Sequence, residues 1–288
     1  MAAGGAVAPV LLGLGAAVTW GGSDFAGGLG TRRAPALLIV ASGHLMTLLA
    51  LAGFCLAIRL PLPPNAQLGY GLLGGLEGAF ALALFYRALA MGAMGLTAAL
   101  TGLLTAAVPV VFALATLGMP GTAATAGLVL GGLAIWMIAY APGHDTPPGA
   151  LVFGAIAGVG FGFQLILLHL ASESGVLWAM TSARFGGVVG VAILLGVLTV
   201  QGKGPLGAGF RPTGFWRMGI LAGVFDTAGN LLYATASHAG RLDIAATVSS
   251  LYPGFTILLA AMILHERPSV RQRLGMAVAL ASVVLLSL

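Results

Sequence analysis

Two carboxyl groups lie inside long apolar runs of this sequence. Glu77 falls in the run 67–90 and Asp226 in the run 214–237. An ionisable group in a membrane-spanning helix costs about 2.5–3.5 kcal/mol on insertion scales, so it is expected to face a cavity or a partner. We predict that both carboxyl groups line a cavity and act as proton or cation sites. The alternative is that each lies near a helix end or pairs with a basic group for packing alone.

Two basic side chains lie in further apolar runs. Arg184 is about two turns into the run 175–200, and a guanidinium there needs an acceptor. It can bind a substrate carboxylate bidentately, or it can pair with an acid as a structural lock. His44, in the run 35–58, is a candidate cavity residue, although a lone histidine is more often a packing residue.

Neutral polar and aromatic residues complete the candidate site. A zwitterionic ligand needs donors and acceptors beside an apolar wall, which Phe80, Phe161 and Phe163 can supply. Trp20 lies deeper than the interfacial aromatic belt and is a candidate cavity wall, whereas Asp24 is expected near the surface. The alternative for each polar residue is hydrogen bonding between helices. The other candidates are Gln164, Asn230, Tyr233, Ser250 and Tyr252.

Two prolines lie inside apolar runs. Pro109 and Pro253 each remove a backbone donor, and a proline inside a helix frees the carbonyl group four residues earlier. We predict a hinge or helix break at both positions, and at Pro253 carbonyl groups freed for a ligand.

The sequence contains no recognisable catalytic motif. Ser172–Glu173–Ser174–Gly175 and Ala41–Ser42–Gly43–His44 come nearest to the Gly-x-Ser-Gly nucleophile of a serine intramembrane protease, and neither matches it. No paired-acid protease motif is present. No two His or Cys residues have metal-ligand spacing on one helix, and Cys55 is the single cysteine. We predict no enzyme activity, no catalytic residues, no metal and no cofactor.

The composition indicates that lipid surrounds the chain. Of the 288 residues, 59% are hydrophobic and 7% are charged, against about 25% charged in a soluble protein. The 46 glycines suit close packing of helices in a membrane. The net charge of +5 is not a sign of nucleic-acid binding, because the Lys and Arg residues are scattered among short loops.

The apolar runs predict an all-α membrane protein with ten spanning helices, since each is close to the roughly 20 residues that cross a bilayer. Their apolar character is continuous and does not alternate, which argues against a barrel. The predicted spans are 7–28, 35–58, 67–90, 94–117, 122–140, 149–170, 175–200, 214–237, 242–264 and 271–288.

Basic residues concentrate on one face of this arrangement, and that face is expected to be cytoplasmic. The opposite face holds only Arg59 and Arg241, so both termini are predicted to be external. No cleavable signal peptide is evident, because no Lys or Arg precedes the first apolar run. The nine residues on the cytoplasmic face are Arg32, Arg33, Arg87, Lys203, Arg211, Arg217, Arg267, Arg271 and Arg273.

The two halves, 1–145 and 146–288, resemble each other weakly. Phe85–Tyr86–Arg87–Ala88 is similar to Leu232–Tyr233–Ala234–Thr235 at an offset near 148, and His44 matches Arg184 at an offset near 140. Glu77 and Asp226 match to within one residue. Five helices per half is an odd number, so the halves are predicted to be inverted repeats around a central cavity, as in secondary transporters. The alternative is a duplication that only enlarged a bundle.

The chain resembles the drug/metabolite transporter superfamily, and within it the ten-helix EamA-type members. The likeness covers nearly the whole chain, and the first half departs from it more: it has His44 in place of the usual arginine and lacks Glu-Arg after Met119–Pro120. Because the family keeps a basic residue at the position of Arg184, the resemblance favours a structural role there. The motifs are Thr19–Trp20–Gly21, Ser182–Ala183–Arg184–Phe185, Tyr86, Tyr233, Pro109, Pro253 and His265–Glu266–Arg267–Pro268 with Gly275.

The resemblance implies a transporter in a bacterial inner membrane that exports small metabolites by alternating access. The chain looks most like amino-acid exporters, including those for aromatic or hydrophobic amino acids. Proton coupling and function as a monomer are further expectations, with the bilayer and a small solute as the partners. The alternatives are export of drug-like cations or of a sugar-type or nucleotide-type solute, a channel, a scaffold, and least of all an intramembrane enzyme.

Overall fold

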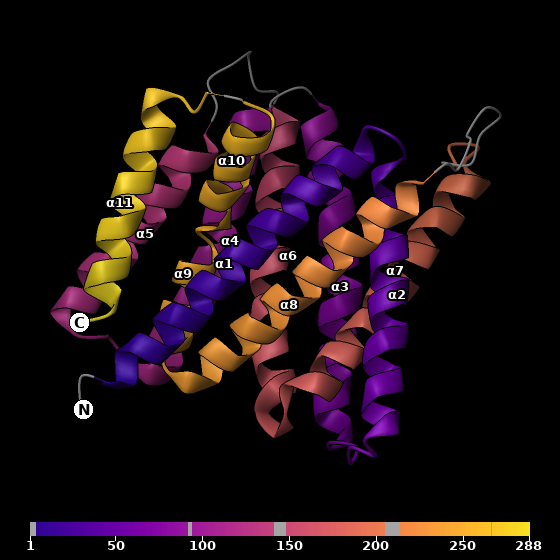
Figure 1. The fold of residues 1–288 in the computed structure, drawn as a ribbon, viewed down its shortest axis with the longest axis horizontal. Coiled ribbons are helices and arrows are strands. Elements are labelled where there is room, and N and C mark those ends of the chain that lie inside the picture. Colours follow the sequence, from indigo (N-terminus) through magenta and orange to yellow (C-terminus); the bar gives the residue numbers. More distant parts are fainter. Residues whose placement is uncertain (1–3, 92–93, 141–147, 205–213, 266) are drawn as a thin grey trace.

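The computed structural model describes residues 4–91, 94–140, 148–204, 214–265 and 267–288, and within these ranges every regular element is a helix (Figure 1). The elements are α1 (Gly4–Thr31), α2 (Ala36–Ala57), α3 (Asn65–Ala90), α4 (Met94–Leu117), α5 (Thr122–Ala139), α6 (Pro148–Ala171), η1 (Ser172–Ser174), α7 (Val176–Val200), α8 (Phe215–Ala239), α9 (Leu242–Ser249), α10 (Tyr252–Ile263) and α11 (Val270–Leu286).

All ten runs expected to be helical are helical, and the run 242–264 is divided into α9 and α10. Of the described residues, seven stretches are long and apolar enough to cross a membrane. The expected count of ten spans exceeds these seven and stays a prediction. The seven stretches are Ala36–Ala57, Asn65–Phe85, Leu100–Leu117, Thr122–Ala139, Gly149–Ser174, Val176–Val200 and Leu242–Ile263.

Large apolar side chains cover the outside of the helices. Leu56, Val111, Met262 and Leu280, from four different helices, are each between 64% and 73% exposed. In water this surface would drive aggregation, whereas in a bilayer it contacts acyl chains. Together with the apolar helices, it identifies a multi-pass α-helical membrane protein.

The two prolines expected to break helices behave differently. Pro253 lies in the first turn of α10, directly after the break that separates it from α9. α4 continues through Pro109 without interruption, so the expected helix break is wrong at that position. A membrane helix tolerates the loss of one backbone hydrogen bond when its neighbours hold it in place.

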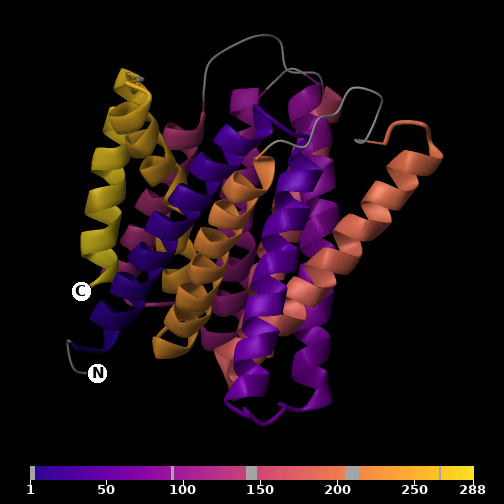
Figure 2. The ribbon, with the colours of Figure 1, turned by 45° about the vertical axis from the view of Figure 1, so that its right-hand side comes forward.

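The helices pack in pairs that join distant parts of the sequence. α1 lies along α8, and α3 lies along both α6 and α7. α2 contacts α7 and α8, while α5 packs on α11 at one side of the molecule (Figure 1). α4 packs on α6, and α1 packs on α9 and α10. Figure 2 shows α7 diverging from α2 and α3 toward its C-terminal end.

Glycines let two of these helix pairs approach to backbone contact. A Cβ on Gly43 of α2 would lie 2.6 Å from the carbonyl oxygen of Gly219 and 3.0 Å from Cα of Gly223, both in α8. A Cβ on Gly75 of α3 would overlap the carbonyl group of Ala183 in α7. Without side chains at these positions, dispersion contacts hold the helices together in lipid.

The two contacts repeat each other residue by residue. A Cβ on Gly71 of α3 would overlap the Ser182 hydroxyl of α7, and one on Gly219 of α8 would overlap the Ser42 hydroxyl of α2. Gly71 and Gly219 are 148 positions apart, and Ser42 and Ser182 are 140 apart. These are the spacings at which the two halves of the sequence resemble each other.

Both termini lie at the lower end of the molecule in Figure 1, where α1 begins and α11 ends. The link between α1 and α2, which carries Arg32 and Arg33, lies at the upper end, as do the starts of α8 and α11. The expected boundary between halves at 145/146, the residue Arg211 and Glu266 of the His-Glu-Arg-Pro motif lie outside the described residues.

The close contact of α2 with α8 predicts a position-specific effect of side-chain volume. Gly43→Val should lower the free energy of unfolding by about 1–3 kcal/mol, because the backbones must separate. Gly53→Val is the matched control on the same helix, since a Cβ there has no neighbour within 4 Å. Thermal unfolding of the detergent-solubilised protein measures both, and equal melting temperatures for the two variants would contradict the packing described.

Candidate functional site

A cavity of about 750 Å³ lies between the helices. Most of the helices contribute side chains to it, including α1, α2, α3, α6, α7, α8 and α10. A volume in this range is typical of small-molecule sites. The cavity is therefore large enough to hold a solute of the size of an amino acid.

The cavity reaches the upper end of the molecule as drawn in Figure 1. Its lining includes Thr31 at the end of α1, Ala139 at the end of α5 and Gln272 in the first turn of α11, all of which lie at the upper end. A capping box between Ser269 and Gln272 fixes the start of α11.

Two hydrogen bonds join the halves at the lower end. Arg241, after α8, donates to the carbonyl oxygen of Gly118 at 2.7 Å and also pairs with Asp243. Trp178 of α7 donates to the carbonyl oxygen of Leu60 at 3.2 Å. The bonds to Gly118 and to Leu60 each join a residue before position 145 to one after it.

An ion pair lies deep in the cavity. Arg184 Nη2 of α7 lies 2.5 Å from Asp226 Oδ2 of α8. The arginine side chain is 4% exposed and the aspartate side chain 33%, so the pair projects one carboxylate toward the cavity. Asn230, one turn along α8, donates from Nδ2 to the backbone carbonyl of Asp226 at 2.8 Å. The guanidinium therefore has the acceptor that an intramembrane arginine needs.

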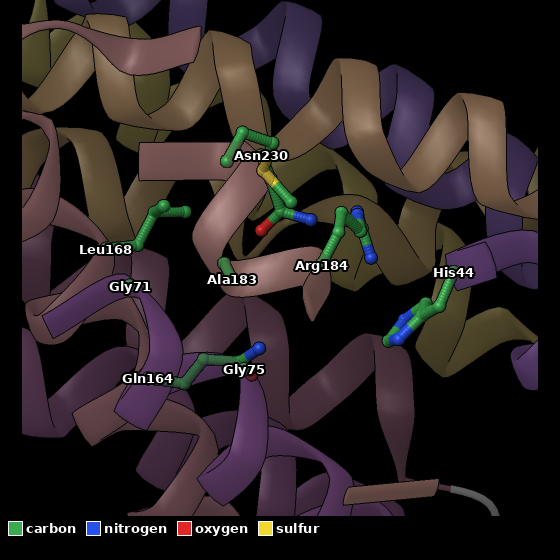
Figure 3. A pocket seen from close by; sticks show the side chains of 10 residues that line it. His44, Gly71, Gly75, Gln164, Leu168, Ala183, Arg184 and Asn230 are labelled. Carbon is green, nitrogen blue, oxygen red and sulfur yellow. The ribbon is translucent and has the colours of Figure 1, made fainter. Parts of the chain in front are cut away.

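A small chamber of about 20 Å³ continues from the cavity (Figure 3). His44, Gly75, Gln164, Arg184 and Asn230 line both spaces. Figure 3 shows the polar ends of Arg184, Gln164 and Asn230 around the chamber. Its volume of about 20 Å³ suffices for about one water molecule and for no larger solute.

Two aromatic pairs contribute to the cavity wall. Trp20 meets Tyr252 edge to face, with ring centroids 6.1 Å apart, and Phe85 meets Phe161 at 6.3 Å. Such edge-to-face pairs hold their rings in fixed orientations. The wall therefore offers rigid apolar surface on both sides of the polar groups.

Most residues predicted for the site do lie together, although they come from six helices and the α9–α10 break. Gln164 and Arg184 are predicted residues from the second half, and Trp20 and His44 are from the first. Five predicted residues are not part of the lining: Glu77, Phe80, Phe163, Tyr233 and Pro109. Those that line the cavity are Trp20, His44, Phe161, Gln164, Arg184, Asp226, Asn230, Ser250, Tyr252 and Pro253.

Glu77 points away from the cavity because of a one-residue difference in register. At the spacing set by the glycine contacts, Asp226 corresponds to Gly78, which lines the cavity, and Glu77 corresponds to Phe225. Adjacent helix residues are rotated by about 100°, so one position separates a cavity side chain from an outer one. Glu77 lies against Gly160 of α6, and its Oε2 is buried with no hydrogen-bond partner among the described residues.

Neither Phe80 nor Tyr233 lines the cavity, and the two side chains differ in burial. Phe80 is 41% exposed and does not line the cavity, so it is part of the outer surface. Tyr233 is fully buried, and its hydroxyl donates to the carbonyl oxygen of Leu165 at 3.2 Å. Tyr233 lies about one turn after Asn230 on α8, in the buried part of that helix.

Asp24 is a cavity residue that the sequence reasoning placed near the surface. Its side chain is exposed, and it lines the cavity. Trp20 and Asp24 are four residues apart, and Ser23, Gly27 and Thr31 share the same helix face and lining. This four-residue spacing in the sequence could have predicted the position of Asp24, because a helix that directs Trp20 toward the cavity also directs Asp24 toward it.

The described residues bring together no group of three His, Cys, Asp or Glu side chains that could hold a metal ion. The acids and bases of the cavity include the Arg184–Asp226 ion pair, the separate carboxyl group of Asp24 and the imidazole of His44. This arrangement can bind a polar solute and exchange protons.

Comparisons with known proteins agree with this geometry. Residues 147–288 match the model of the EamA-like transporter family. The match supports the resemblance to the drug/metabolite transporter superfamily. A solved structure described as "Crystal structure of protein" aligns with a TM-score of 0.74 and 18% identity, over 96% of this chain and 95% of that chain. At this identity the likeness shows a shared fold. No curated protein matches the chain.

The ion pair predicts energetic coupling between α7 and α8. Arg184→Met should lower the free energy of unfolding by about 1.5–3 kcal/mol, because Asp226 keeps a charge without a partner. Asp226→Asn in the same chain should restore part of that loss. Melting temperatures of the wild type, both single variants and the double variant test this. Strictly additive effects would contradict a direct interaction.

Proposed function

We propose that the protein is a secondary transporter that moves small solutes across the membrane by alternating access. The observation that carries the proposal is a cavity with charged and polar groups in its lining inside a membrane protein, which reaches one end of the molecule while hydrogen bonds join the two halves at the other. The match of the C-terminal half to a transporter family supports it. Members of that family are transporters and not enzymes.

The two halves are proposed to be inverted five-helix repeats. The contact of α2 with α8 corresponds to that of α7 with α3 through glycines at equivalent positions. The pairing of α1 with α8 likewise corresponds to that of α6 with α3. An exchange of the halves leaves these contacts unchanged, which is the property of a two-fold axis. Transporters of this kind open alternately by rocking one repeat against the other.

The open end of the cavity is proposed to face the cytoplasm of a bacterial cell. Arg32 and Arg33 lie at that end, as do Arg217 at the start of α8 and Arg271 in α11. At the closed end, Arg241 is neutralised by Asp243. The positive-inside rule then places both termini outside an inner membrane. The structure is thus proposed to be the inward-open state of an exporter.

Amino acids are the proposed substrates, with hydrophobic and aromatic ones favoured. Pairing of Asp226 with Arg184 leaves the deep site close to neutral, which suits a zwitterion better than two free acids would. The aromatic pairs supply an apolar wall for a side chain. Export of a drug-like cation or another small metabolite is the alternative. One chain encloses the whole cavity, so the monomer is proposed to be the functional unit.

Solute flux into proteoliposomes tests the proposal directly. The purified chain is reconstituted, and uptake of labelled phenylalanine, a sugar and a nucleotide is followed over time. Saturable, protein-dependent uptake of phenylalanine is the expected result. Because uptake requires the cavity to open at both ends, a rate equal to that of empty liposomes for every solute would contradict transport.

Proton coupling through Asp226, one of the two carboxyl groups in the cavity lining, gives a more specific prediction. Asp226→Asn should abolish the dependence of flux on an imposed pH gradient, because the variant cannot exchange a proton with the cavity. Glu77→Gln is the control, since Glu77 does not line the cavity and the chemical change is the same. Flux in Asp226→Asn that still depends on the pH gradient would contradict the proposal that Asp226 carries the coupled proton.

A further inference from the structure

Asp24 differs from the other acid of the cavity in having no basic partner. The described residues form two ion pairs, Arg184 with Asp226 and Arg241 with Asp243, and neither involves Asp24. Asp24 lines the cavity from α1, and Asp226 lines it from α8. The cavity lining thus holds two carboxyl groups and one guanidinium, with His44 and Tyr252 as the other titratable side chains, and Asp24 is the carboxyl group that forms no ion pair among the described residues.

Rigid aromatic rings lie beside this carboxylate. Trp20 is one helical turn from Asp24 on the same face of α1, and its ring contacts Tyr252 and Tyr233 at centroid distances of 6.1 and 5.8 Å. Tyr252 and Trp20 line the same cavity as Asp24. A carboxylate next to aromatic faces is a favourable environment for an ammonium group, through a charge-assisted hydrogen bond and cation–π attraction.

The backbone of α1 is fixed where it presents these residues. Ser23 donates to the carbonyl oxygen of Ala222 in α8 at 2.9 Å, and a Cβ on Gly21 would lie 2.6 Å from Cβ of Phe255 in α10. The helix α1 is therefore held against α8 and α10 in the segment between Trp20 and Asp24. The carboxylate has a defined position over the cavity, as a recognition group requires.

We infer that Asp24 binds the ammonium group of the transported solute, with Trp20 and Tyr252 packed against the apolar part beside it. This inference rests on the proposed function and narrows its substrate class to solutes with a cationic amine. Hydrophobic amino acids and aralkylamines both satisfy this requirement. An anionic solute of the same shape does not, because its carboxylate would meet a second negative charge.

Three probes that differ only in their charged groups test the inference: phenethylamine, phenylalanine and 3-phenylpropionate. Equilibrium dialysis of the labelled probes against the purified full chain at neutral pH, without any gradient, measures binding apart from transport. The wild type should bind both amines and bind 3-phenylpropionate at least about tenfold more weakly. Asp24→Asn should weaken amine binding by about tenfold or more, as expected for loss of one charge-assisted hydrogen bond.

Two control variants separate a specific effect from misfolding. Asp24→Glu keeps the charge and should retain most of the amine affinity. Glu77→Gln removes a carboxyl group outside the lining and should leave all three affinities unchanged. Equal amine affinity in Asp24→Asn and the wild type would overturn the inference, and so would a wild type that binds neither amine.

The inference and the proposed function can fail separately. Saturable flux of phenylalanine with unchanged amine binding in Asp24→Asn would leave a transporter without this recognition site. Amine binding that depends on Asp24, in a chain that moves no solute through liposomes, would leave the site without transport. Loss of the response to a pH gradient in Asp24→Asn, with amine affinity unchanged, would assign Asp24 to the coupling proton and overturn its role toward the solute.

Discussion

Close backbone contact between helices is the constraint on which the rest of this structure depends. In lipid, apolar side chains gain nothing by leaving the solvent, so helices associate through dispersion contacts and hydrogen bonds. Gly43 against Gly223 and Gly75 against Ala183 bring α2 onto α8 and α3 onto α7. These contacts join the two halves of the chain, and the cavity lies between the faces that they align.

Polar groups then collect where lipid is absent. Arg184 and Asp226 neutralise each other across α7 and α8, and Asn230 donates to the backbone beside them. Asp24 and the break before Pro253 face the same space from α1 and α10. The cost of an ionisable group in the membrane interior thus explains why the site is at the centre and why its members come from many helices.

Hydrophobicity made the helices predictable, because a spanning run is a property of local sequence. The lining was less predictable, since it depends on helix rotation, and one residue of error turns a side chain by about 100°. Glu77 was predicted inside and Asp24 near the surface, and the structure places Asp24 in the lining and Glu77 outside it. Pro109 was expected to interrupt a helix, but its neighbours keep α4 continuous. The sequence around Pro109 does not show which helices pack against α4.

The central claim is that the closed end must open during each transport cycle. Gln67 of α3 and Glu173 of η1 meet across that end, with Nε2 and Oε2 3.5 Å apart, and the native Cys55 is fully buried. A short bifunctional thiol reagent can therefore join Gln67→Cys to Glu173→Cys with little reaction elsewhere. Alternating access predicts that the cross-link stops solute flux in proteoliposomes and that reduction restores it. Undiminished flux through the cross-linked protein would contradict the account.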